Sequence, residues 1–211
     1  MGVIKRGILG GISGKVANVV GGSWKGIAYL RALPLSVANP QTAGQVGQRT
    51  KFATALVIAQ AILAGIIKPL NDRFVSGMSG CNAFVSRAIP FISSVGVVTW
   101  ASIQTSVGSL LGFSGLTLVG SAATNVATID WVNNSGTGNA LATDITYFAV
   151  YNETQDVWGV SAAGTTRNAP DDTIAFTDLV LNDVLHLYAS LLAANGSKVS
   201  TSDYVTANCG A

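Results

Sequence analysis

The sequence has little of what most catalytic and metal sites are built from: among 211 residues there is one histidine, one glutamate and two cysteines. His186 has no second imidazole or thiol pair to accompany it, which argues against a zinc site or a Cys–His dyad. Cys81 and Cys209 lack metal-site spacing, and the sequence does not decide whether they pair. Paired acids for proton transfer cannot be identified either, since Glu153 lies at an expected hairpin tip. We therefore predict a protein that is not an enzyme and binds no cofactor or metal.

Charge is scarce as well. Charged residues make up 10% of the chain, against about 25% in typical soluble domains, while 49% of residues are hydrophobic and mean hydropathy is +0.46. Apolar surface in excess of one core must be covered, and subunit interfaces are the natural place. The composition predicts an oligomer or larger assembly, with a membrane protein as the competing interpretation.

The longest apolar run argues against a membrane span. Phe52–Ile67, 16 residues long, would extend about 24 Å as a helix, short of a hydrocarbon core of about 30 Å. Lys51 and Lys68 bracket it, so there is no charge bias between its ends. The first 22 residues contain no continuous apolar stretch, so we expect no signal peptide. A buried helix in a protein made in the cytosol, or in a particle assembled there, fits best.

The few charges are strongly separated along the chain. Residues 1–87 carry ten cations against one acid, giving +9, and residues 88–211 carry two cations against nine acids, giving −7. A cationic half suits a polyanion such as nucleic acid. Halves of opposite charge can equally attract each other, within one chain or between copies. Both interpretations remain open at this point.

Residues 1–37 are rich in glycine and contain five cations and no acid. Two β-like runs, Lys15–Val20 and Ser23–Arg31, flank Gly21-Gly22, which predicts a β-hairpin with its turn at this pair. Alternation in the second run puts Trp24, Ala28 and Leu30 on one face and Lys25, Ile27, Tyr29 and Arg31 on the other. Because an isolated hairpin is marginal in water, we expect this arm to pack on something else.

Residues 38–104 show helical spacing of apolar side chains. The first helix is expected to begin with Asn39 as N-cap and Pro40 at the first position, or at a capping box of Thr42 and Gln45. Pro69 should end or kink it. A second, shorter helix is expected from about residue 79 to 88, stopped by the proline at 90.

From residue 105 onward, short β-like runs alternate with turn residues. The runs are Leu116–Val119, Val126–Val132, Asp144–Tyr151, Val157–Ala162, Thr173–Thr177, Val184–Leu192 and Lys198–Ser202. Seven strands in about 90 residues predict an immunoglobulin- or fibronectin-like β-sandwich. In Val184–Leu192 the leucines alternate with His186, Tyr188 and Ser190, typical of a strand buried on one face only. The fold class is therefore α+β, with three segments: an arm at 1–37, a helical segment at 38–104 and a sandwich at 105–211.

Aromatic residues interleaved with cations in the N-terminal half suit contact with nucleic acid or with a neighbouring subunit. The candidate contact residues are Lys5, Arg6, Lys15, Trp24, Lys25, Tyr29, Arg31, Arg49 and Lys51. Such binding would be directed at the phosphate backbone and weakened by salt. The alternative is an ordinary amphipathic hairpin with solvated cations. A phosphate loop at Gly14-Lys15 is excluded, because Leu9 and Val16 occupy positions that need Gly and Ser or Thr.

Several segments resemble a family of short uncharacterised proteins found mainly in Bacteroidota genomes and their mobile elements. They include residues 14–20 (GKVANVV), 23–27 (SWKGI), Gln48-Arg49 followed by Phe52, 82–86 (NAFVS) and 134–140 (NSGTGNA), together with Trp131 and Tyr151-Asn152. The Ser-Trp-Lys-Gly segment is the most particular. The resemblance covers most of the chain and implies one recurring unit with an N-terminal signature and a β-rich C-terminal part. It implies no activity and no functional residue.

The sequence leads to three functional hypotheses. The first is a self-assembling structural protein, a virion or virus-like capsid subunit, whose basic half faces nucleic acid or neighbouring subunits. The second is a non-enzymatic binding module whose sandwich loops recognise a surface ligand. The third, a hydrolase, requires His186 to lie beside a nucleophile and an acid in a cleft.

Overall fold

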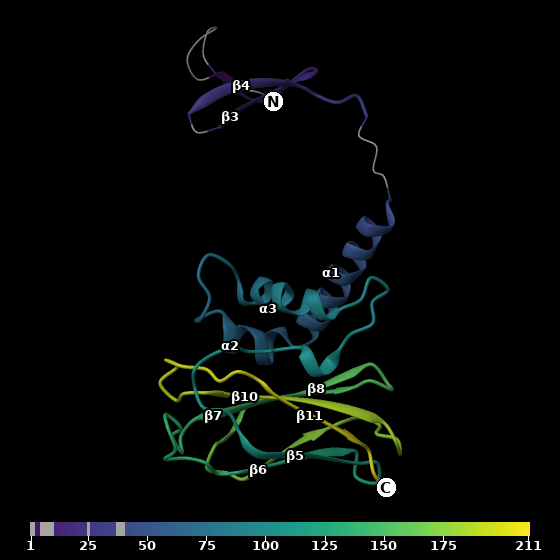
Figure 1. Cartoon of the computed structure of the whole chain (residues 1–211), viewed down its shortest axis with the longest axis vertical. Helices are drawn as coiled ribbons and strands as arrows, with labels where there is room; N and C mark the ends of the chain where they lie inside the picture. The colour runs from purple at the N-terminus through teal and green to yellow at the C-terminus, as the bar shows by residue number, and fades with distance from the viewer. Residues whose placement is uncertain (1–2, 5–10, 25, 37–40) are drawn as a thin grey trace. The chain divides into compact units, whose positions relative to one another are not determined.

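The structure, a computed structural model, describes residues 3–4, 11–24, 26–36 and 41–211 (Figure 1). Contacts group the chain into two compact units, residues 1–42 and residues 43–211. The helices and the β-sandwich therefore belong to one unit, and the glycine-rich arm forms the other.

The arm is an antiparallel sheet rather than a single hairpin. Its strands are β1 (Val3–Ile4), β2 (Ile12–Val16), β3 (Val19–Trp24) and β4 (Ile27–Ala32), paired in chain order. The predicted turn at Gly21-Gly22 is wrong, since both glycines lie inside β3. The connections between β2, β3 and β4 lie instead at Ala17-Asn18, where Ala17 has a positive φ of 49°, and at residues 25–26.

The two central glycines serve close packing rather than a turn. A Cβ on Gly21 would collide with the backbone carbonyl of Ile12, and one on Gly22 would lie 2.8 Å from the Tyr29 hydroxyl oxygen. Glycine in a strand interior marks such close approaches as readily as it marks a turn. Sequence alone does not separate the two cases.

The second unit begins with helices that bend sharply. α1 (Ala43–Ala61) starts directly after Thr42, at the place of the alternative capping box, while Asn39 and Pro40 lie outside the described residues. The following elements are η1 (Leu63–Ile67), α2 (Lys68–Asn71), α3 (Gly80–Ala88), η2 (Ile89–Phe91) and η3 (Trp100–Ser102). α1 and the segment 63–71 meet at 74°.

The bend falls before Pro69. The carbonyl of Ile62 accepts from the N–H groups of both Ile66 and Ile67, which widens the helix at this point. Pro69 instead lies in the first turn of α2, where its missing N–H costs nothing. The second predicted helix is confirmed as α3, with Ser79 as its N-cap accepting from the N–H of Asn82. Among the described residues no single helix is long and apolar enough to cross a membrane. Only α1 and the segment 63–71, counted together despite the bend, have the length and composition of a membrane span.

The predicted β-sandwich is confirmed, and with it the α+β fold class. One sheet has the order β11-β10-β7-β8 and the other β5-β6-β9. The strands are β5 (Ser114–Ser121), β6 (Val126–Val132), β7 (Ile145–Asn152), β8 (Val157–Thr166), β9 (Asp171–Ala175), β10 (Val184–Leu192) and β11 (Asp203–Asn208). Six predicted runs match strands, but Lys198–Ser202 does not. Val199 and Ser200 make only isolated bridges, and the last strand follows them as β11.

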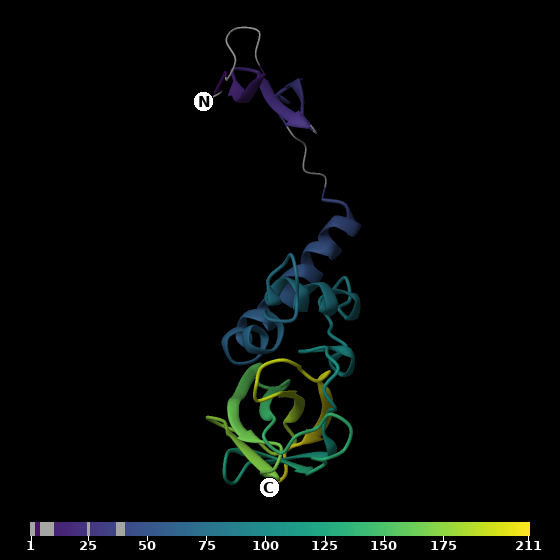
Figure 2. The same cartoon turned by 90° about the vertical axis from the view of Figure 1, so that its left-hand side faces the viewer.

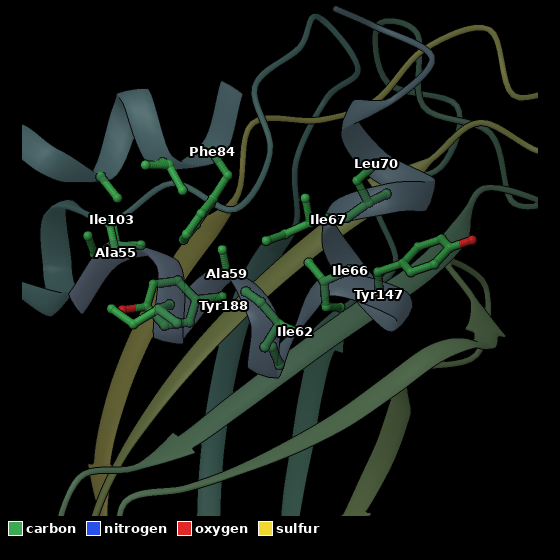
Figure 3. Close-up of a cluster of buried hydrophobic side chains, with 14 of the residues drawn as sticks. Ala55, Ala59, Ile62, Ile66, Ile67, Leu70, Phe84, Ile103, Tyr147 and Tyr188 are labelled. Atoms are coloured by element: carbon green, nitrogen blue, oxygen red, sulfur yellow. The ribbon is translucent and has the colours of Figure 1, made fainter. Parts of the chain in front are cut away.

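The unit has three layers, because the helices cover the outer face of the four-stranded sheet (Figures 1 and 2). β7 and β10 are consequently buried on both faces. Phe148 and Leu187 point into the core between the sheets, while Tyr147 and Tyr188 pack against the helices. Figure 3 shows this outer core, where the bent helix and α3 bring their apolar side chains together over the two tyrosines.

The helical layer corrects the expectation for β10. His186, Tyr188 and Ser190 are buried rather than facing solvent. Their polar atoms are satisfied locally: the Tyr188 hydroxyl donates to the carbonyl of Trp100, and Ser190 contacts the Ser106 hydroxyl at 2.8 Å. A polar row on a strand can thus mark a second, hydrogen-bonded interface instead of a solvated face.

Candidate functional site

One face of the arm sheet gathers most of the predicted contact residues that the structure describes. Lys15 pairs with Val20, which pairs with Arg31, and directly opposed residues point to the same side of a sheet. Trp24 pairs with Ile27, and Tyr29 lies between Ile27 and Arg31 in alternation. We call this set the cation–aromatic face: Lys15, Val20, Trp24, Ile27, Tyr29 and Arg31.

This grouping corrects the expected position of Trp24. It was expected on the side of Ala28 and Leu30, as if one strand ran without interruption from residue 23 to 31. In the structure β3 ends at Trp24 and β4 begins at Ile27, so the alternation restarts after the turn. The result places both large aromatic side chains on the same face of the sheet as both described cations of the arm.

The cation–aromatic face is open to solvent. Trp24 is 68% exposed and Ile27 70% exposed, and Lys15, Tyr29 and Arg31 are exposed as well. Rings and cations displayed on a sheet are the chemistry with which proteins bind single-stranded nucleic acid: bases stack on rings while cations meet phosphates. This face has the groups required for such binding.

The opposite side of the same sheet carries no charged residue among those described. We call it the uncharged face: Ile12, Val16, Val19, Ala28, Leu30 and Ala32. Leu30 is 59% exposed, and every residue of β4 is exposed. β4 is also an edge strand of the sheet, with one side of its backbone unpaired by any described strand.

The remaining candidate residues lie elsewhere. Lys5, Arg6 and Lys25 fall outside the described residues. Arg49 and Lys51 are on α1, in the second unit, and two positions apart they project to opposite sides of the helix. Arg49 is exposed and, with Gln45, Gln48 and Phe52, lines a hollow of about 550 Å³, while Lys51 is half-buried.

The acidic half contributes less surface charge than its composition suggests. Of its nine acids, Asp144 and Asp183 are buried and Asp172 and Asp203 are partly buried, each accepting hydrogen bonds within the fold. The exposed acids are Asp130, Glu153, Asp156, Asp171 and Asp178. The charge separation therefore remains, but about half of the negative groups have structural partners.

Three aromatic rings and a carboxylate form a second surface feature, at the junction of α1 with the β7–β8 hairpin. Trp100, Tyr151, Asp156 and Trp158 line a cavity of about 360 Å³ closed on the other side by α1 residues, including Val57. We call it the aromatic groove. Sequence reasoning missed it, because its residues come from positions 53–58, 96–100 and 151–158 and no local pattern links them.

His186 lies behind this groove. Its Nδ1 is 2.7 Å from the Tyr204 hydroxyl and its Nε2 is 3.1 Å from a Glu153 oxygen, and its ring stacks on Trp100 and Tyr151. In the hydrogen bonds of the described residues, neither nitrogen meets a serine, threonine or cysteine. The imidazole thus lies between a tyrosine hydroxyl and a carboxylate, and it helps to hold Glu153 in place. The described residues also contain no cluster of three metal-ligating side chains.

The His186–Glu153 contact gives a pH-dependent prediction. The hydrogen bond from His186 lowers the pKa of Glu153 below its usual value, and Trp100 Nε1 adds a second donor at 3.1 Å. A carboxyl whose pKa is depressed in the folded state adds stability above its unfolded pKa of 4.5, and this is lost as pH falls through the folded pKa. Urea denaturation of wild type and Glu153→Gln should thus differ above pH 4.5 by less than about 1 kcal/mol, since Glu153 is half exposed, and the two should converge as the pH falls through the lowered pKa of Glu153. A difference that persisted unchanged at low pH would contradict this.

Comparison with known proteins places the chain in a family. The model described as "Family of unknown function (DUF6266)" matches residues 11–206, which include β2–β4 of the arm sheet, the helices and most of the sandwich. The chain belongs to this family. No curated protein matches the sequence significantly.

Two of the solved structures similar to this family member are a fibronectin type III domain and an Fn3-like protein. A domain of human collagen alpha-1(XX) is 13% identical, covering 48% of this chain and 87% of its own, with a TM-score of 0.36. An Fn3-like protein from Clostridium thermocellum is 15% identical, covering 48% of this chain and 94% of its own, with a TM-score of 0.33. The chain thus spans nearly the whole of each of these small domains and extends well beyond them.

Proposed function

We propose that the protein is a non-enzymatic structural subunit that self-assembles through its arm sheet. In this proposal it is made in the cytosol of Bacteroidota, encoded in their genomes or mobile elements, and forms a virion or virus-like capsid. The uncharged face packs against another copy, and the cation–aromatic face contacts enclosed nucleic acid.

The observation that supports this is the exposure of large apolar side chains on both sides of the arm. Among residues 11–24 and 26–32 only Gly21 is buried, and glycine has no side chain, so this part of the sheet has no core of its own. Small sheets need a packed face to be stable, and an open apolar edge strand is a template for pairing with another chain. A second copy of the arm supplies both a matching uncharged face and a matching edge.

Assembly is tested by light scattering of the purified full-length chain during size exclusion, followed by electron microscopy. We expect species far above the 21.6 kDa of one chain. Leu30→Asp, on the uncharged face, should lower the assembled fraction about tenfold or more, because it buries a charge in the proposed contact. Leu181→Asp, at a leucine of similar exposure in the second unit, is the matched control and should assemble normally. A wild-type monomer at micromolar concentration would refute the proposal.

Nucleic-acid contact is tested through its salt dependence. Lys15→Gln with Arg31→Gln removes both described cations of the cation–aromatic face, and should reduce the slope of log K against log salt by about 1.4–1.8 for two lost phosphate contacts. The control pair Lys68→Gln with Arg73→Gln removes two exposed cations of the second unit and should leave the slope unchanged. Equal slopes for wild type and the arm variant would assign these charges to protein contacts.

The binding-module hypothesis remains a second candidate, because the aromatic groove is a formed cavity on the sandwich unit. It predicts a soluble protein of low oligomeric order. Light scattering therefore separates the two proposals.

A further inference from the structure

We infer that the aromatic groove binds a lysine or arginine side chain from the basic arm of a second copy. This inference rests on the proposed self-assembly and specifies one of its contacts. The groove supplies the two elements that favour a cation, which are ring faces and a carboxylate.

Three aromatic rings line the site and contact one another. The Tyr151 ring is 4.4 Å from the Trp100 ring at 42° and 4.8 Å from the Trp158 ring at 30°. Trp100 and Trp158 are 6.3 Å apart and inclined at 69° to each other. All three rings line the cavity, and a cation is attracted to the face of an aromatic ring.

The carboxylate is held in position at the rim. The Tyr151 hydroxyl donates to Oδ1 of Asp156 at 2.9 Å, and Asp156 sits at the β7–β8 turn with a positive φ of 55°. The ion pairs of the described residues are Arg167 with Asp144 and His186 with Glu153, so Asp156 lacks a described cationic partner. No lysine or arginine is among the described residues that line the groove.

The cations that the groove lacks are present in the N-terminal arm. Residues 1–37 hold five cations and no acid, and the described pair, Lys15 and Arg31, is exposed on the arm sheet. Five of the six exposed acids belong to residues 88–211, and Asp156 is the one that lines the aromatic groove. Charge complementarity therefore favours an arm cation, and in an assembly a neighbouring copy presents that arm at high local concentration.

The decisive variant is Asp156→Asn. Asparagine tolerates positive φ, and its side-chain oxygen can still accept from Tyr151, so the turn and the ring stack are preserved. We expect the association constant from concentration-dependent light scattering to fall about tenfold, with a smaller loss at high salt. Asp178→Asn removes an exposed acid outside the groove and is the matched control, expected to associate like wild type.

A direct probe uses the fluorescence of the groove's tryptophans. Arginine amide titrated into wild type at a protein concentration too low for assembly should change the emission, and the same titration into Asp156→Asn should give a response at least about fivefold weaker. If wild type assembles and Asp156→Asn assembles equally well, the groove inference is wrong while self-assembly stands. If wild type is monomeric, self-assembly itself fails. A variant effect independent of protein concentration would mean that the groove takes its own chain's arm, and would also overturn the inference.

Discussion

Replacing Arg167 with alanine is expected to destabilise the second unit by about 3–5 kcal/mol, because it leaves a carboxylate buried without its cation. Arg167 is completely buried, and its Nε lies 3.1 Å from Oδ2 of Asp144, which is also buried. The same guanidinium donates to the carbonyls of Leu111 and Gly112 at 2.7 and 3.0 Å. One side chain thus neutralises an acid and also provides hydrogen-bond donors for two backbone carbonyls of the loop at residues 111–112.

The measurement is urea denaturation followed by tryptophan fluorescence. Since domains of this size are stable by about 5–15 kcal/mol, the midpoint should fall by about a fifth or more. Lys198→Ala, at an exposed cation of the same half, is the control and should change stability by no more than about 0.5 kcal/mol. Arg167→Met combined with Asp144→Leu should recover most of the loss, because it removes both charges together. Equal midpoints for Arg167→Ala and Lys198→Ala would show that the ion pair contributes nothing.

The strands of the sandwich were predictable because each carries its own local signal. Val126–Val132 and Val184–Leu192 are bounded by turn residues, and both match the observed strands. The helical layer over the sheet was not predictable from these runs, since the side chains of β10 that it covers are polar or amphipathic. Ser190 and His186 indicate a solvated face unless the hydroxyls and carboxylate that pair with them are known.

For the candidate site as well, the residue types could be predicted from the sequence and their arrangement in space could not. Composition identified Lys15, Trp24, Tyr29 and Arg31, but their common face depended on strand pairing and on β3 ending at Trp24 and β4 beginning at Ile27. A missed break between two strands can transfer a side chain to the other face, as happened for Trp24. The aromatic groove depends on packing between α1 and the β7–β8 hairpin, and long-range packing leaves no spacing pattern in the sequence.

Phe84→Ala should destabilise the second unit by about 3–5 kcal/mol, the usual cost of truncating a fully buried phenylalanine. Phe84 lies on α3 in the core between the helices and the four-stranded sheet (Figure 3), and none of its surface is exposed. Phe52→Ala is the matched control, since Phe52 lies on α1 and is 51% exposed, and it should cost less than about 1 kcal/mol. Because helices and sandwich share this core, circular dichroism at 222 nm and tryptophan fluorescence should give one common midpoint in wild type and in Phe84→Ala. Separate midpoints in wild type would mean that the helical layer folds apart from the sandwich, and the three-layer unit would then be two domains in contact.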